Sequence, residues 1–465
     1  MILNLNPQAV RDLPPDERDK LAKLLNTYQT HDAKNSQKSR YYEGKISVNS
    51  VNLGLALPKG IGKLEIGCAW GAKTVDVLAA RSMFDGYVDT NGEPVTELES
   101  LVTANRLVAE YMKACRDELL YGCTFATLSG DPTIGCKIRF HSPRTAAARW
   151  DGDKGRIAYG FAIVDTAPNN SDAMMWSPSV VNFYTDNALW VLTRRRGTSD
   201  WYARGYAHRM GRPLMEPLIW NATSDKPFGR SRIKEPVRRL IDSYVRTIAN
   251  ATIGLEFSTA PQKYLLGVTD DQYDAIINDK FRQYVGSIIA STTDENGEKP
   301  TFGQLAQGSL TPHVDMLRML ATQFSAATGL TVSDTGVVND ANPTSSDAIL
   351  AQSTTLVSMA EQLNAGNGDA LRVIAQMALA IANKTTIEGL SDEQRGLVAH
   401  FKNPAMPSLA ATADAALKIA TNRTAFASTD VYLEMMGFSQ ADIRRINAQE
   451  TRARGLATLG EMGLE

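Results

Sequence analysis

The sequence predicts an α+β protein in which helical and β-rich stretches follow one another along the chain. Helical spacing of apolar residues dominates both ends, while short alternating runs broken by Gly, Pro and Asn fill residues 122–218. Separate runs of helices and strands are typical of the α+β class. Hydrophobic residues make up 43% and charged residues 22% of the 465 residues, which indicates packed globular domains, two to four at about 100–200 residues each.

The first part of the chain combines helices with a sheet region. Residues 16–45 predict a polar helix, Val75–Arg81 a short one, and Glu97 to Leu120 one long helix. From Gly122 to Leu218 the alternating runs predict antiparallel strands and hairpins.

Two further helices follow residue 225. The first is amphipathic, and its predicted buried face consists of Ile233, Val237, Leu240, Ile241, Tyr244, Val245, Ile248 and Ile253. A mixed segment, 262–306, contains a predicted strand at Tyr284–Ser291. Thr311-Pro312 opens the second helix, since proline is tolerated at the first helical position.

The remainder is a loop followed by helices. Thr331–Pro343 is polar and carries Gly, Asn and Pro, so it predicts a loop. A third helical tract runs from Ser345 or Ser346 to about Asn383, with a predicted interruption at Gly366-Asn367-Gly368. An Ala-rich helical cluster, about 405–460, ends the chain.

Charge and cysteine content restrict the classes of function. Lys and Arg number 49 against 51 Asp and Glu, a net charge of −2, and a protein that grips DNA tightly usually has a basic excess. Four cysteines without C-x-x-C spacing predict reduced, mostly buried thiols of a protein made in a cytoplasm. With neither a signal-peptide pattern nor an apolar run of about 20 residues, we expect a soluble chain and no membrane partner.

No catalytic, cofactor or metal motif emerges from the sequence. Gly60-Ile61-Gly62-Lys63 suggests a phosphate loop, but Leu57 replaces its first glycine and Leu64 its Ser or Thr, so a turn is favoured. The five histidines lack metal-ligand spacing, and no G-x-S-x-G elbow occurs. Asp270, Asp271 and Asp274 suit a helix start better than a cation site. We therefore expect no enzyme and no cofactor.

A series of short motifs in fixed order resembles the portal proteins of tailed bacteriophages, specifically of siphophages that infect Gram-positive hosts. The main motifs are His208–Leu214, Pro227–Ile233, and Glu256-Phe257 with Pro261–Tyr264 and Gly267. Supporting matches are Tyr41–Lys45, Val75–Arg81, Ser142-Pro143-Arg144, Phe302–Leu305 and Ser345–Ile349. The resemblance covers about residues 40–385, and the last 80 residues add nothing to it.

The resemblance implies the portal architecture, mostly helical with a β-rich wing and a small α/β clip. The implied parts are a wing (1–225), a first stem helix (226–261), a clip (262–307), a second stem helix (308–330), a tunnel loop (331–344), a long bent wing helix (345–400) and a crown (401–465). It also implies a homo-oligomeric ring, usually a dodecamer, with heterologous interfaces that close.

The implied function is a channel at one capsid vertex for packaging and ejection of double-stranded DNA. The implied partners are the terminase large subunit, a head-completion or adaptor protein of the head-tail connector, and the major capsid and scaffolding proteins. We expect the chain in the virion, and in the host cytoplasm during assembly.

The tunnel loop is the candidate DNA-contacting site. It contains no Lys or Arg, and its candidate residues are Val332, Asp334, Gly336, Val337, Val338, Asn339 and Asp340. Because each phosphate neutralised by a cation adds affinity, such a loop would touch a moving duplex without holding it. An ordinary exposed connection is the alternative interpretation.

Two further sets are candidates by position. On the first stem helix Arg238, Arg239 and Arg246 would face the channel or a neighbouring subunit, and a solvated helix face is an equal alternative. In the clip the candidates for docking terminase and connector proteins are Lys280, Arg282, Glu298 and Lys299.

Three other readings stay open at this point. The first is a related structural ring of a defective prophage or gene-transfer particle. A nucleotide-using enzyme would bind and turn over ATP, which the incomplete phosphate loop argues against. A sequence-specific DNA-binding protein would need a basic recognition element, which the charge balance disfavours.

Overall fold

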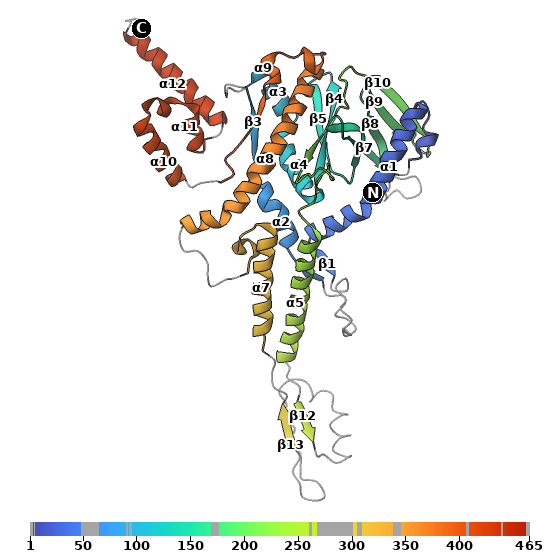
Figure 1. Cartoon of the computed structure of the whole chain (residues 1–465), viewed down its shortest axis with the longest axis vertical. Helices are drawn as coiled ribbons and strands as arrows, with labels where there is room; N and C mark the ends of the chain where they lie inside the picture. Colours follow the sequence, from blue (N-terminus) through green and yellow to red (C-terminus); the bar gives the residue numbers. More distant parts are fainter. Residues whose placement is uncertain are drawn as a thin grey trace, which may run out of the picture. The chain divides into compact units, whose positions relative to one another are not determined.

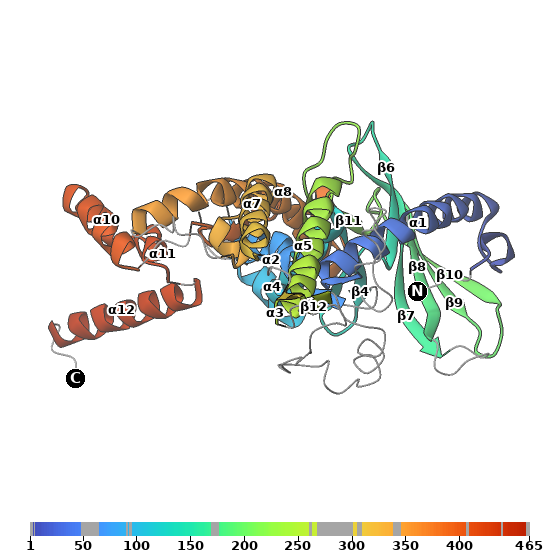
Figure 2. The ribbon, with the colours of Figure 1, turned by 90° about the horizontal axis from the view of Figure 1, so that it is seen from below.

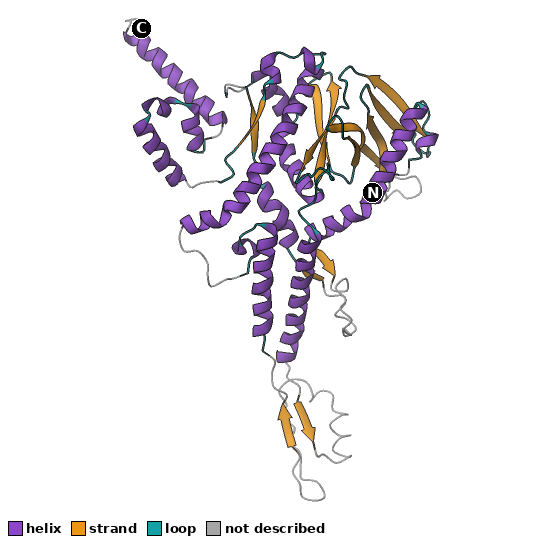
Figure 3. Ribbon diagram, viewed as in Figure 1, coloured by secondary structure: helices purple, strands orange, loops and turns teal. Residues whose placement is uncertain are grey.

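The computed structural model of the chain is drawn in Figure 1 and, by secondary structure, in Figure 3. It describes residues 3, 5–47, 65–89, 92, 95–168, 176–259, 263–266, 301–304, 309–337, 346–405, 409–438 and 440–461. These residues form two compact units. The large unit consists of Met1–Tyr42, Ala72–Lys234 and Pro343–Glu465, and the small unit of Glu43–Gly71 and Glu235–Asn342.

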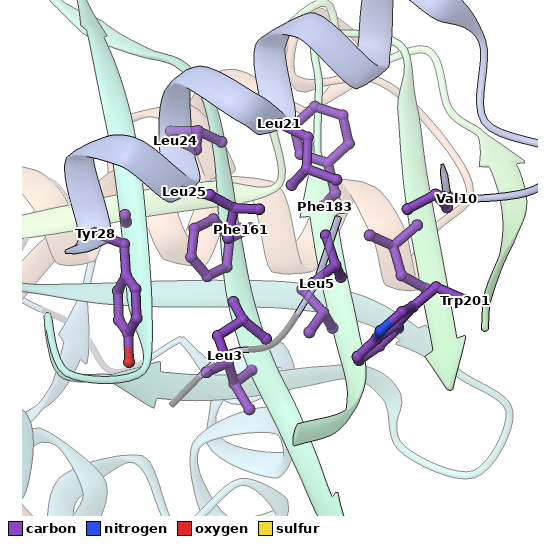
Figure 4. Packing of buried hydrophobic residues seen from close by; sticks show 14 of the residues in the cluster. Leu3, Leu5, Val10, Leu21, Leu24, Leu25, Tyr28, Phe161, Phe183 and Trp201 are labelled. Carbon is purple, nitrogen blue, oxygen red and sulfur yellow. The ribbon is translucent and has the colours of Figure 1, made fainter. Parts of the chain in front are cut away.

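A five-stranded antiparallel sheet and its covering helix make one core of the large unit. The strand order is β10-β9-β8-β7-β6, with β6 Ala146–Asp151, β7 Arg156–Pro168, β8 Trp176–Tyr184, β9 Ala188–Arg194 and β10 Trp201–Ala207. Helix α1 (Pro15–Tyr42) places Leu21, Leu24 and Tyr28 against Phe161 and Phe183 of the sheet (Figure 4). All five side chains are buried, so this apolar layer fixes α1 on the sheet.

A three-stranded sheet forms a second core. Its order is β11-β4-β5, with β4 Cys123–Asp131, β5 Gly135–His141 and β11 Met215–Ile219. Helices α4 (Leu107–Tyr121) and α8 (Ser346–Ala382) both pack on it. Residues 123–128 of β4 are all buried, which is why this strand has no alternating polar face.

The C-terminal region belongs to the large unit. Strand β14 (Val398–Phe401) pairs with β3 (Phe84–Val88), so residues on both sides of the predicted boundary at 400/401 share one sheet. Helices α10 (Leu409–Asn422), α11 (Asp430–Met435) and α12 (Gln440–Glu461) follow. An ion pair between Arg444 and Glu99 joins α12 to α3 (Thr96–Ala104), and Ile443 beside it is fully buried.

The small unit is built on two helices that lie side by side, as Figures 1 and 2 show. They are α5 (Glu235–Thr259) and α7 (Thr311–Thr328). Val237, Ile241 and Val245 recur every four residues on α5 and are buried, as predicted. Two short antiparallel pairs complete the unit: β1 (Lys45–Ser47) with β2 (Glu65–Gly67), and β12 (Lys263–Leu266) with β13 (Thr301–Gln304).

Two predicted helix boundaries were wrong. The predicted helix Glu97–Leu120 is broken at Asn105-Arg106, because Asn105 accepts a hydrogen bond from Ile138 N and donates to Cys136 O, which ties the break to β5. Helix α5 starts at Glu235 rather than near residue 226. Before α5, Arg230 N donates to Trp220 O and Arg232 N donates to Leu119 O. These hydrogen bonds hold the segment before Glu235 in a non-helical conformation.

The predicted interruption at Gly366-Asn367-Gly368 was also wrong, since α8 is continuous from Ser346 to Ala382. The predicted strand Tyr284–Ser291 lies outside the described residues.

The predicted state of the cysteines is confirmed, because all four are free and buried. Among the described helices, none combines the length and the apolar content that a membrane span requires.

Candidate functional site

The candidate site is the turn that follows α7 in the small unit. Gly329 ends the helix in the left-handed conformation (φ 72°), and its N–H donates to Ser325 O at 2.8 Å. Ser325 Oγ then donates to Leu330 O at 2.6 Å, and the Leu330 side chain is buried. The chain therefore leaves α7 in one defined direction.

Residues Val332–Thr335 form a single 3-10 turn, η4. Its capping box pairs Thr331 with Asp334: Asp334 Oδ2 accepts from Thr331 N at 2.9 Å and from Thr331 Oγ1 at 2.8 Å. Gly336 ends the turn at φ 73°, a conformation that glycine adopts at no steric cost. The carboxylate of Asp334 is thus engaged in holding the backbone.

Trp70, from a distant part of the sequence, is packed against this turn. Its indole N–H donates to Thr335 O at 3.0 Å. Its ring centroid lies 4.2 Å from that of Tyr244 on α5 and 4.5 Å from that of Phe324 on α7. Trp70 is 2% exposed and Phe324 is fully buried. Two helices and the turn therefore meet at one aromatic side chain.

The structure places some predicted loop residues in this turn and leaves others outside the described part. Val332, Asp334 and Val337 are half-buried and Gly336 is exposed, as is Ser333. Val338, Asn339 and Asp340 lie outside the described residues, as do the clip candidates Lys280, Arg282, Glu298 and Lys299.

The three stem arginines all lie on α5. Arg239 forms an exposed ion pair with Glu235 one turn earlier, at 2.6 Å, and both its Nε and its terminal nitrogen donate to that carboxylate. Arg238 and Arg246 are half-buried. The pair between Arg239 and Glu235 is the ordinary i,i+4 arrangement of a helix surface.

A buried polar cluster in the large unit was not predicted. Asn367 Nδ2, on α8, donates to Glu118 Oε2 at 2.8 Å and to Tyr111 OH at 2.9 Å, and Tyr111 OH shares a 2.6 Å hydrogen bond with Ser82 Oγ. Glu118, Tyr111 and Asn367 have no exposed surface. Burial raises the pKa of Glu118 to about 8, so this carboxyl is protonated at neutral pH.

This cluster is a structural element of the core rather than an open acid–base site, because none of its members reaches solvent. The lining of a cavity of about 980 Å³ near the end of α8 includes His208, Arg209 and Lys384, and none of its described residues carries a carboxylate or a thiol. Among the described residues, no three His, Cys, Asp or Glu side chains are grouped to bind a metal ion.

Comparison with known proteins identifies the family. Residues 22–455 match the family model described as phage portal protein, SPP1 Gp6-like. The chain is 24% identical over 455 residues to the portal protein of Mycobacterium phage D29, covering 94% of this chain and 90% of the relative. It is 22% identical over 457 residues to the portal protein of Mycobacterium phage L5, with the same coverage.

Two solved structures align with most of the chain. A chain from the neck of an empty GTA particle computed with C6 symmetry matches with a TM-score of 0.46 and 12% identity, over 79% of this chain and 90% of that chain. A chain from the neck of a native GTA particle computed with C12 symmetry gives a TM-score of 0.40, also at 12% identity, over 81% and 89% of the two chains.

The family model spans most of the chain, and both of these relatives are named as portal proteins of phages. The chain belongs to the family of SPP1 Gp6-like phage portal proteins. The predicted family and the α+β class are both confirmed.

Proposed function

We propose that twelve copies of the chain assemble into a closed ring. The channel of this ring guides double-stranded DNA at the capsid vertex during packaging and ejection. Membership of the portal family supports this proposal. The structural observation that carries it is the turn after α7, which is folded, anchored by Trp70 and free of cationic side chains.

In this proposal the parts of the chain take the following roles. The small unit supplies the stem, with α5 and α7, and the clip around β12 and β13. The large unit supplies the wing, α8 its long helix, and residues 401–465 the crown. The turn 331–337 is the start of the tunnel loop.

The charge of the turn decides how it would treat DNA. Thr331–Pro343 carries no Lys or Arg, and Asp334 is held by Thr331 rather than projecting freely. Contact with phosphates through such a surface is steric, and it adds none of the salt-dependent affinity that each cation contributes. The turn therefore acts as a guide that the duplex passes.

The proposed partners follow from this role. The ring has no catalytic site of its own in the proposal, so the energy for DNA movement comes from a terminase motor. Terminase, and later a head-completion or adaptor protein, would dock on the clip, while capsid and scaffolding proteins would contact the wing. Assembly takes place in the host cytoplasm, and the product is part of the virion.

Ser333→Lys tests the guiding role, because Ser333 is exposed and takes no part in the capping box. Each copy then presents one cation to passing phosphates. The control is Thr193→Lys, an exposed position on β9. We expect both variants to give procapsids of normal composition. For Ser333→Lys, the amount of packaged DNA should fall several-fold at low salt and return to the control value at high salt.

The measurement is the amount of nuclease-protected DNA per procapsid over a range of salt concentrations. Equal packaging by the two lysine variants at every salt concentration would show that the turn does not meet DNA.

A further inference from the structure

We propose that Trp70 is a positioning residue of the channel, which fixes the turn Val332–Thr335 to both stem helices. This inference rests on the proposed function, because it concerns the same turn. It adds a residue from outside the stem and loop segments to the machinery that holds the loop.

Trp70 stacks on aromatic rings from both stem helices. The ring lies between Tyr244 of α5 and Phe324 of α7, at centroid distances of 4.2 and 4.5 Å and interplanar angles of 36° and 33°. Aromatic rings at such distances attract one another beyond the effect of area burial. The stack therefore couples α5 to α7 through Trp70.

The second support is the hydrogen bond to the turn. A 3-10 turn of four residues leaves carbonyl groups without intrahelical partners, and the Thr335 carbonyl receives the Trp70 N–H at 3.0 Å. Thr335 is 8% exposed, so loss of the Trp70 N–H would deprive a carbonyl group in a largely buried residue of this hydrogen bond.

The local bonds of the turn explain why an external anchor matters. The capping box between Thr331 and Asp334, and the bond from Thr335 Oγ1 to Val332 O at 2.6 Å, hold the turn together internally. None of these bonds reaches α5. Trp70 supplies that link, so the turn keeps one position relative to both helices.

Tryptophan meets both requirements at once. Phenylalanine would keep an aromatic ring between Tyr244 and Phe324 but has no N–H to donate. The variant Trp70→Phe therefore separates the anchoring of the turn from the packing of the helices. Trp201→Phe is the matched control, since Trp201 is 3% exposed in the core of the large unit.

The experiment measures amide hydrogen exchange of residues 331–337 in assembled rings, together with DNA packaging. We expect Trp70→Phe to form rings, to accelerate exchange of the Asp334 and Gly336 amides at least tenfold, and to lower DNA retention. Trp201→Phe should leave the exchange of this segment and the retention of DNA unchanged.

The outcomes distinguish this inference from the proposed function. Unchanged exchange in Trp70→Phe would overturn the anchoring role, whatever the packaging result. Faster exchange with normal packaging would overturn the positioning role in the channel, while Ser333→Lys still tests the function itself. If Trp70→Phe does not fold, Phe324→Leu takes its place, because it weakens the stack and keeps the indole donor. The inference then fails unless Phe324→Leu accelerates hydrogen exchange of the Asp334 and Gly336 amides.

Discussion

The buried carboxyl of Glu118 gives the stability of the large unit a defined pH dependence. Glu118 Oε2 accepts from Asn367 Nδ2, while Glu118 Oε1 and Asn367 Oδ1 are buried without a partner among the described residues. A proton on the carboxyl removes the charge that burial disfavours. Replacement by glutamine keeps the shape and makes the group neutral at every pH.

The magnitude follows from the two pKa values. The pKa of Glu118 is about 8 in the folded chain against an ordinary value of 4.5. Between these values the folded state keeps a proton that the unfolded chain has lost, so the free energy of unfolding falls as pH rises through this window and levels off above it. At roughly 1.4 kcal/mol per pH unit, the total loss is about 5 kcal/mol.

The assay is chemical denaturation of the wild type and Glu118→Gln from pH 4 to pH 9. The difference between the two curves isolates Glu118, because other titrating groups are common to both. We expect the variant to gain on the wild type by about 5 kcal/mol across the window. Glu110→Gln, on the same helix but partly exposed, is the control for a Glu-to-Gln change on α4. A pH-independent difference for Glu118→Gln would refute a protonated Glu118.

Three further predictions concern packing. In thermal unfolding, Gly229→Ala should destabilise the chain by more than about 2 kcal/mol, because φ of Gly229 is +67° and an added Cβ would lie 2.1 Å from Trp220 O. The control Gly152→Ala, at a position with open space around it, should have little effect in that assay. Burial raises the pKa of all four cysteine thiols. A thiol reagent at pH 8 should therefore label none of them in the folded chain and all four in denaturant. Rapid labelling of the folded chain would contradict this expectation. Phe161→Ala should lower the free energy of unfolding in urea by about 3–5 kcal/mol, since Phe161 is fully buried under α1, and a loss below about 1 kcal/mol would contradict the described core.

Periodic apolar spacing made much of the fold predictable. Val237, Ile241 and Val245 repeat at helical spacing, and the burial of this face of α5 follows from that pattern. The alternating runs after Gly122 gave strands for the same reason. Boundaries failed where tertiary hydrogen bonds outweighed local preference, as at Asn105, whose side chain bonds to β5.

Asn367 shows why a local pattern can mislead. Gly-Asn-Gly favours a helix break when only neighbours in the sequence are considered. In the folded chain the Asn367 amide bonds to Glu118 and Tyr111, both more than 200 positions away, and the helix continues. No sequence pattern carries that information.

The candidate site was predictable only in part. The spacing of Thr331 and Asp334 is that of a capping box, and it could have indicated a folded turn before the structure was known. Trp70 could not have been found this way, because a single tryptophan has no local signal for the helices it joins. Its proposed role rests on stacking with two distant rings and on a hydrogen bond between residues 265 positions apart.

Electron microscopy of the purified full chain would show directly whether the chain forms a ring. We expect closed rings with a central opening wide enough for a DNA duplex, and class averages with one dominant rotational symmetry. Compact monomers that persist at high protein concentration, or open filaments in place of closed rings, would contradict the proposed ring.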